Sequence, residues 1–200
     1  MPERRRTPDS SSAGRSAAVV RAAYGGASAS GAVQVSGDDT ATLTPAQRRT
    51  RVGLVPQTAA DLLYLETVAE ECAAADGGVE ASAGTCRGLL DRLAPGIDDG
   101  VHPRDLSEGQ RLALALSIVL TARPPVVLLA THDVEFAAHV ADEVVVMAEG
   151  EVVSSGPPRR VLAESPSFAP QVTKVLGAPW LVVEEVAAAL GATEPEEARS

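Results

Sequence analysis

The stretch that decides the fold is Asp105-Leu106-Ser107-Glu108-Gly109-Gln110-Arg111, which stands directly before a long apolar segment. Ser107 can cap a helix, and Gln110, three residues on, can reach back to the Ser107 N–H, as in a capping box. Gly109 carries no Cβ, so another molecule can approach the backbone closely there. Because a helix N-terminus also favours an anion, two interpretations stay open: a well-capped helix, or a site that holds a phosphate.

Three further segments favour the second interpretation. In chain order they are Arg51-Val52-Gly53-Leu54-Val55-Pro56-Gln57, Leu128-Leu129-Ala130-Thr131-His132-Asp133, and Val144-Val145-Val146-Met147-Ala148-Glu149-Gly150-Glu151-Val152-Val153 with Gly156 after it. They resemble the Q-loop strand, the switch-histidine strand and the closing hairpin of ATP-binding cassette (ABC) transporter ATPases, and Leu106-Ser107-Glu108-Gly109-Gln110 resembles the signature motif. The resemblance covers about Gly31 to the end. The segment from Pro170 to Ala187 resembles the C-terminal extension of the energy-coupling-factor (ECF) importers.

The resemblance implies an α/β fold. We expect an incomplete P-loop NTPase-like parallel sheet with a helical subdomain, a C-terminal antiparallel hairpin and a small helical extension. The expected boundaries are a disordered tail over 1–30, a truncated ABC ATPase domain over 31–162 with its helical subdomain at about 58–108, and the extension over 163–200. The tail is rich in Arg, Ser, Ala and Gly and shows no sustained periodicity.

The resemblance also implies roles for individual residues. In the family, each ATP lies between the P-loop of one ATPase domain and the signature motif of another. The signature residues would therefore bind the ATP of a partner chain; they are Leu106, Ser107, Glu108, Gly109 and Gln110. Gln57 would ligate Mg²⁺ and sense the γ-phosphate, and His132 would contact the γ-phosphate and the attacking water, so these two are the candidate catalytic residues. Glu108 stands where glycine is usual, and its negative charge opposes phosphate binding.

The chain departs from the family pattern at the P-loop (Walker A). A hydrolytic P-loop needs G-x-x-x-x-G-K-[ST], whose amides cradle the phosphates while the lysine reaches the terminal ones. The chain's single lysine is Lys174, far downstream, and no Gly-Lys-Ser or Gly-Lys-Thr occurs in the sequence. We therefore expect no ATP hydrolysis by this chain alone.

A second departure lies after the strand that begins near Pro124. In the family this strand ends in the Walker B acidic pair, which holds Mg²⁺ and polarises the attacking water. Here Leu129 runs directly into Ala130-Thr131-His132-Asp133, with no turn residues between Leu129 and Ala130. We interpret this as an in-frame loss that joined the front of one strand to the back of the next. Asp133 suits the N-cap of the following helix and does not replace the acidic pair.

Composition excludes several classes of protein. A net charge of −10 argues against a nucleic-acid-binding protein. No apolar run approaches the roughly 20 residues of a membrane span, and Arg4-Arg5-Arg6 is followed by Ser-rich sequence rather than the apolar stretch of a signal peptide. Cys72 and Cys86 lack a metal-like spacing and are interpreted as free thiols in a reducing compartment. The expected location is cytoplasmic, peripheral at the inner face of the membrane.

Periodicity and breakers predict the secondary structure. Helices are expected at 45–49, 61–75, 85–93, 110–122, 134–141, 159–164, 170–176 and 182–190, with a short one possible at 17–23. Strands are expected at 31–35, 51–55, 124–129, 143–148 and 151–154. The helix over 110–122 is apolar nearly all round and should be buried.

Two classes of function follow. The first is a partial ATP-binding subunit of an ABC/ECF-type importer, which works with ATP and Mg²⁺ only beside a homologous intact ATPase and a transmembrane subunit. The second is a non-catalytic interaction or regulatory protein that docks on transporter subunits. By resemblance, the segment from Tyr64 to Glu71 is where family members dock the coupling helix of the transmembrane subunit, so Glu66, Glu70 and Glu71 are candidate contacts. The alternative is a solvated helix face. A decayed gene product with open sheet edges is the remaining alternative.

Overall fold

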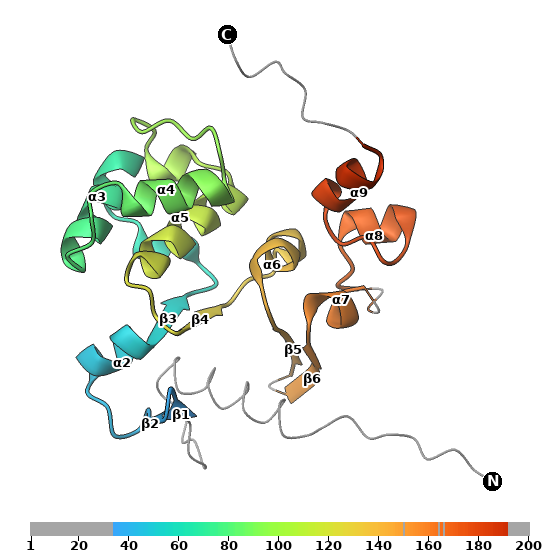
Figure 1. Cartoon of the computed structure of the whole chain (residues 1–200), viewed down its shortest axis with the longest axis horizontal. Coiled ribbons are helices and arrows are strands. Elements are labelled where there is room, and N and C mark those ends of the chain that lie inside the picture. Colours follow the sequence, from blue (N-terminus) through green and yellow to red (C-terminus); the bar gives the residue numbers. More distant parts are fainter. Residues whose placement is uncertain (1–33, 150, 164, 166, 192–200) are drawn as a thin grey trace. The chain divides into compact units, whose positions relative to one another are not determined.

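The structure is a computed structural model that describes residues 34–149, 151–163, 165 and 167–191. The tail predicted over 1–30 and the short helix predicted at 17–23 lie outside these residues. The described chain forms two compact units that divide between His132 and Asp133, and each is described by itself (Figure 1). The boundary placed at 162 by resemblance stays a prediction.

The N-terminal unit is mixed α/β. Its strands are β1 (Gln34–Val35), β2 (Asp38–Asp39), β3 (Val52–Val55) and β4 (Val126–Leu129), and its α-helices are α2 (Pro45–Arg51), α3 (Val68–Gly78), α4 (Thr85–Leu93) and α5 (Glu108–Thr121). Two 3₁₀ turns, η1 (Ala59–Leu62) and η2 (Pro103–Asp105), complete it. Strands β1 and β2 pair antiparallel.

Strands β3 and β4 form the parallel sheet that the sequence predicts. The register pairs Val52 with Val126 and Val55 with Leu129, and the ladder continues with a hydrogen bond from the Ala130 N–H to the Val55 carbonyl at 3.0 Å. Gly53 allows close packing of β3, because a Cβ there would lie 2.4 Å from Val119 Cγ1 of α5 and 2.9 Å from Pro124 Cγ. The α/β class and the parallel pairing are confirmed.

Helix α5 is the centre of the unit. Leu112, Ala113, Leu114, Ala115, Leu116 and Ser117 are buried in an unbroken run, which confirms the expectation of burial on nearly every side. Helices α3 and α4 pack against α5 and against each other. The sequence places both helices in the predicted helical subdomain, and α4 has the bounds that its periodicity predicts.

Helix α3 begins later than its periodicity predicts. The prediction started the helix at Asp61, but η1 ends at Leu62 and α3 starts only at Val68. The buried Glu71 carboxylate accepts hydrogen bonds from the Tyr64 and Leu65 N–H groups at 2.5 and 2.7 Å, which holds these residues outside the helix. Thr67 then caps α3 in a capping box with Glu70.

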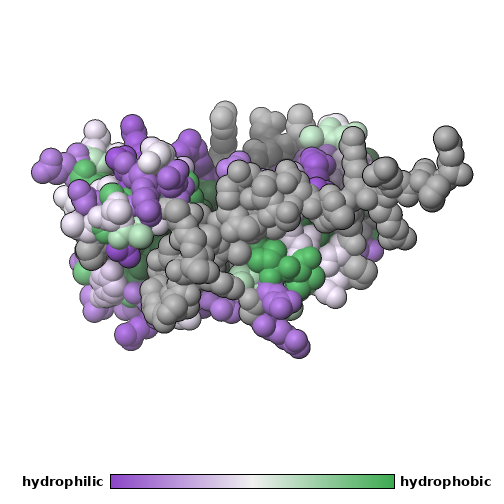
Figure 2. All heavy atoms as spheres, turned by 90° about the horizontal axis from the view of Figure 1, so that it is seen from below, coloured by the Kyte–Doolittle hydropathy of each residue, from purple (hydrophilic) through white to green (hydrophobic). Residues whose placement is uncertain are grey.

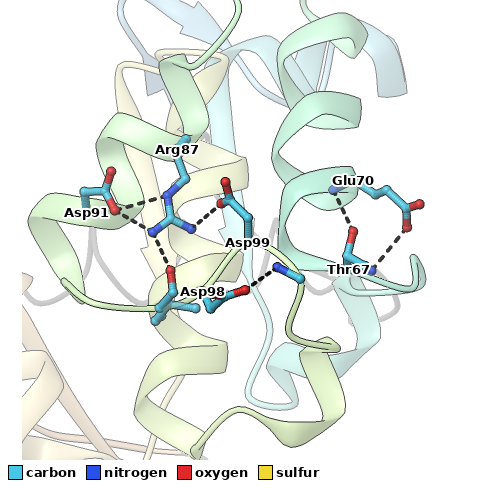
Figure 3. A network of polar contacts seen from close by, with 8 residues as sticks. Thr67, Glu70, Arg87, Asp91, Asp98 and Asp99 are labelled. Atoms are coloured by element: carbon cyan, nitrogen blue, oxygen red, sulfur yellow. Dashed lines mark hydrogen bonds and ion pairs between the residues drawn. The ribbon is translucent and has the colours of Figure 1, made fainter.

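A polar network ties the loop before η2 to both helices (Figure 3). Arg87 of α4 bridges Asp91 at 2.6 Å and Asp99 at 3.0 Å, and it also donates to the Ile97 carbonyl at 2.8 Å. The hydrogen bond to Asp91 raises the pKa of Arg87, with smaller contributions from the charges of Asp91 and Asp99. Residue Asp99 also accepts the Ala69 N–H of α3 through its carbonyl at 3.0 Å. The loop that leads to the signature stretch is therefore anchored at both helices.

The C-terminal unit holds a hairpin and short helices. Its elements are α6 (Val134–Val140), β5 (Val144–Ala148), β6 (Glu151–Gly156), α7 (Pro158–Val161), α8 (Gln171–Leu176) and α9 (Val183–Ala189). Strands β5 and β6 pair antiparallel, with an irregularity between Val146 and Met147, so the predicted hairpin is confirmed. Large hydrophobic residues of this unit also reach the surface, including Val153, Val175 and Leu190, and Figure 2 shows hydrophobic surface beside hydrophilic surface on one face of the molecule.

Ion pairing orders the end of this unit. Glu185 of α9 accepts the Leu181 N–H at 2.9 Å and pairs with Arg159 of α7. The hydrogen bond from Leu181, together with the charge of Arg159, lowers the pKa of Glu185. The predicted helices over 159–164, 170–176 and 182–190 are each present in shorter form.

Candidate functional site

The signature stretch forms the capped helix start that its sequence predicts. The Gln110 N–H donates to Ser107 Oγ at 3.2 Å, and the Ser107 N–H donates to Gln110 Oε1 at 3.0 Å. Ser107 Oγ acts only as an acceptor in this capping box, so its own proton stays available for an incoming oxygen. Leu106 is buried at 6% exposure, so its side chain belongs to the core, and its predicted role in nucleotide binding stays a prediction.

A pocket of about 680 Å³ opens beside this helix start, entirely within the N-terminal unit. Gln57 follows β3, Glu108 opens α5, and His132 follows β4; all three line this pocket. The parallel pairing of β3 with β4 explains why two of them meet, since the carboxyl ends of parallel strands lie at one edge of the sheet. Ser107, Gly109 and Gln110 stand next to the pocket in sequence but do not line it.

Glu108 and His132 face each other inside the pocket. His132 Nε2 lies 3.1 Å from Glu108 Oε1, and the two side chains are 65% and 63% exposed. A pair this open to solvent contributes little to the free energy of folding. The pair matters for binding instead, because Glu108 contacts the imidazole that, by resemblance, would contact the γ-phosphate.

Two arginines also line the pocket, and the sequence assigned them no role. They are Arg104 of η2 and Arg111 of α5. Arg111 Nη1 donates to the Arg104 and Leu106 carbonyls at 3.1 and 2.8 Å, which fixes its guanidinium beside the helix start. Their only sequence signal is that both flank the signature stretch. Two guanidinium groups against one carboxylate favour an anion here, although the whole chain carries a net charge of −10.

His102 lines the same pocket. Its Nδ1 accepts the Arg104 N–H at 3.0 Å, and its Nε2 lies 3.6 Å from Glu66 Oε2. The Nδ1 bond fixes the tautomer with hydrogen on Nε2 when the ring is neutral. Sequence reasoning left His102 without a role, and the structure makes it a wall of the pocket.

The donor set of this pocket does not fit Mg²⁺. A magnesium site is built from carboxylate and other oxygen ligands, but β4 is followed by Ala130 and Thr131 where a carboxylate is needed. Asp133 caps α6 by accepting the Phe136 N–H at 2.9 Å. Within the described ranges, no group of three or more His, Cys, Asp or Glu residues could hold a metal ion. The assignment of Gln57 as a metal ligand therefore stays a prediction without a supporting partner.

Comparison with known proteins finds relatives that share one description. No family model matches the chain. A putative ABC transporter ATP-binding protein of Streptomyces avermitilis is 50% identical over 194 residues, which covers 81% of this chain and 35% of that protein. One of Streptomyces coelicolor is 54% identical over 173 residues, covering 70% of this chain and 31% of that protein. The chain thus spans about a third of the length of these two relatives.

More distant proteins carry related names. The energy-coupling factor transporter ATP-binding protein EcfA2 of Lacticaseibacillus paracasei is 28% identical over 153 residues, covering 58% of this chain and 53% of that protein. Among solved structures, CbiO1 of Clostridium perfringens, part of the ABC transporter complex CbiONQ, has a TM-score of 0.44 and 19% identity, covering 73% of this chain and 69% of that one. Across the described residues, no helix combines the length and apolarity needed to cross a bilayer.

Proposed function

We propose that this chain, which belongs to the family of ABC transporter ATP-binding proteins, supplies one half of an ATP site and needs a partner ATPase for the other half. The observation that carries the proposal is the shared pocket of Gln57, Glu108 and His132. The pocket offers guanidinium groups for phosphate oxygens, and the capped start of α5 lies beside it. It offers neither a lysine nor an acidic pair, so the chain does not hold MgATP by itself.

The lengths of the alignments support an internal loss, which we place after β4. The match to the S. avermitilis protein runs over 194 positions but covers 81% of 200 residues, so about 32 positions have no counterpart here. The S. coelicolor match shows a similar excess of aligned positions over matched residues, because it runs over 173 positions but covers 70% of the chain. An excess of this size agrees with the junction between Leu129 and Ala130, where the acidic pair, a helix and a strand are expected by resemblance.

In the proposed complex, Ser107 donates its hydroxyl to a terminal phosphate held by the partner, and Arg111 orients the helix start through its carbonyl contacts. Glu108 must release His132 before the imidazole can approach the same phosphate. The chain therefore contributes binding and orientation, and no step of hydrolysis is assigned to it alone. The proposed location is the inner face of the membrane, where a transmembrane subunit of an importer would hold both ATPase chains.

Association with the intact Streptomyces avermitilis relative tests this proposal. We expect the purified chain to bind that relative in the presence of ATP and not in its absence. Ser107→Arg should abolish this association, because the larger cation blocks the phosphate from the helix start. Ser82→Arg places the same side chain on an exposed loop of the same unit and should leave it unchanged. Association that ignores both ATP and Ser107→Arg would contradict the proposal.

A docking protein without a nucleotide role is the second candidate, and one observation favours it. Tyr64 is 76% exposed beside η1, whose residues line the pocket, and the Glu66 side chain is 85% exposed. Glu71 is buried and Glu70 completes the capping box, so neither is a free contact residue. If Tyr64→Ala removed binding to a transmembrane subunit while ATP and Ser107→Arg had no effect on any association, this candidate would replace the first.

A further inference from the structure

The two cysteines of the chain lie in the same small region of the helical subdomain. Cys72 is on α3 and Cys86 is in the first turn of α4, and both are buried and free of a disulfide. The chain has no other cysteine. Neither thiol lines the pocket of Gln57 and His132, so the proposed function makes no use of them.

Asp76 fixes the position of Cys86 against α3. It lies one turn after Cys72 on the same helix face, and its carboxylate accepts the Gly84 N–H at 2.7 Å and the Cys86 N–H at 2.9 Å. The start of α4 is therefore held beside the face of α3 that carries Cys72. Each thiol shifts the pKa of the other, so the two side chains lie close enough to interact.

This contact makes the two thiols chemically unequal. The hydrogen bond with Cys72 lowers the pKa of Cys86, and the N-terminal turn of α4 favours the thiolate further. The same hydrogen bond, together with burial, raises the pKa of Cys72. One sulfur is thus the preferred nucleophile, while the other is a neighbouring thiol that can resolve an adduct.

A second cleft lies near Cys86 and is lined by the residue that precedes it in the chain. It has a volume of about 320 Å³ and lies between the loop after α3 and the end of α5, with Thr85 and Thr121 among its lining residues. Thr85 precedes Cys86 in the chain, and an interaction with Thr121 also lowers the pKa of Cys86, although the Thr121 hydroxyl donates its hydrogen bond to the Ser117 carbonyl.

We propose that Cys72 and Cys86 form a thiol–disulfide exchange site that closes into an intramolecular disulfide when it meets a small disulfide such as oxidised glutathione. The Cys86 thiolate attacks one sulfur of the reagent, forming a mixed disulfide and releasing one glutathione thiolate. Cys72 then loses its proton and attacks the Cys86 sulfur, which releases the second glutathione as a thiolate. The protein has lost two electrons and two protons, and one disulfide has become two glutathione molecules.

The disulfide would join α3 to α4 across a loop of about 15 residues, a length for which cross-linking restricts the unfolded chain appreciably. The two equilibria are coupled. If the disulfide raises the free energy of unfolding, folding must make formation of the disulfide more favourable by the same free energy. We expect the native chain to hold the disulfide on the order of 100-fold more tightly than the denatured chain does. The oxidised chain should also melt roughly 10 °C higher than the reduced chain.

The test equilibrates the full chain in buffers with a range of reduced-to-oxidised glutathione ratios, with and without denaturant. Acid quenching, alkylation and peptide mass mapping then give the fraction in which Cys72 and Cys86 are joined. The expected result is a native disulfide that withstands on the order of 100-fold more reducing buffer than the denatured one. An equal or lower resistance in the native chain would overturn the proposal, because the native geometry would then oppose the bond.

A variant pair sharpens the assignment of roles. Cys72→Ala should trap a stable glutathione adduct on Cys86, since the resolving thiol is gone, whereas Cys86→Ala should react more slowly at Cys72. The reverse order of reactivity would overturn the assignment of Cys86 as the nucleophile. Disulfide-linked pairs of chains, in place of an internal bond, would overturn the site itself. The wild-type equilibrium needs no variant, so the proposal stays testable if either substitution impairs folding.

Discussion

Helix α5 and strand β4 follow one another in the chain and are both strongly apolar, yet their surroundings differ. Six consecutive residues of α5 are buried, whereas all four residues of β4 remain partly exposed. Helix α5 packs against α3, α4 and β3. Within the described ranges, β4 forms strand pairs only with β3. A four-residue apolar run is typical of a strand covered on both faces. The comparison indicates that α5 is enclosed by its neighbours, whereas β4 is covered only in part.

The largest expected effect tests this difference with one type of substitution. Leu114→Ala removes a fully buried side chain from α5 and should lower the free energy of unfolding by about 4 kcal/mol. Leu128→Ala removes the same atoms from the partly exposed β4 and should cost only about 1 to 2 kcal/mol. Urea unfolding of the two variants measures both values. Equal losses would mean that β4 is as well supported as α5.

A smaller effect is expected where the helix meets the sheet. Gly53→Ala places a Cβ 2.4 Å from Val119 Cγ1, so α5 or β3 must shift. We expect this substitution to lower the free energy of unfolding by about 2 kcal/mol. Gly88→Ala is the matched control, because a Cβ there meets nothing within 4 Å. This substitution should raise the free energy of unfolding by about 1 kcal/mol, since alanine favours the helical conformation of α4 more than glycine does. Thermal unfolding of the pair decides the point. A harmless Gly53→Ala would show that the contact between α5 and β3 is loose.

The smallest effect on stability is expected at the start of α5. Ser107→Ala removes the acceptor for the Gln110 N–H and should lower the free energy of unfolding by about 1 kcal/mol. Ser82→Ala, on an exposed loop, should change it by only a few tenths. If Ser107→Ala is neutral in urea unfolding, the capping box does not support the signature helix, and the contrast with β4 weakens.

The sequence predicted the elements whose signals are local. The capping pattern of Ser107 and Gln110, the apolar run of α5 and the hairpin around Glu149 all depend on neighbours in the chain, and the structure contains each of them. The start of α3 was predicted too early because Glu71, which reads as a solvated acid, is buried and binds the Tyr64 and Leu65 N–H groups. Spacing alone cannot reveal such a contact.

The candidate site was predictable only in part, for the same reason. Gln57 and His132 follow parallel strands, so their shared position follows from the motifs. The roles of Arg104 and His102 depend on the 3₁₀ turn before α5, which has no periodic signal. The Glu108–His132 pair depends on where β4 ends relative to α5, and that geometry arises from tertiary packing rather than from any motif.

Steady-state MgATP hydrolysis by the purified chain tests the central claim, that the supported signature helix stands beside a sheet without the groups needed for hydrolysis. We predict no turnover above background for the wild type and the same result for His132→Ala. Turnover that His132→Ala abolishes would contradict it, because the chain would then bind and cleave ATP without a partner.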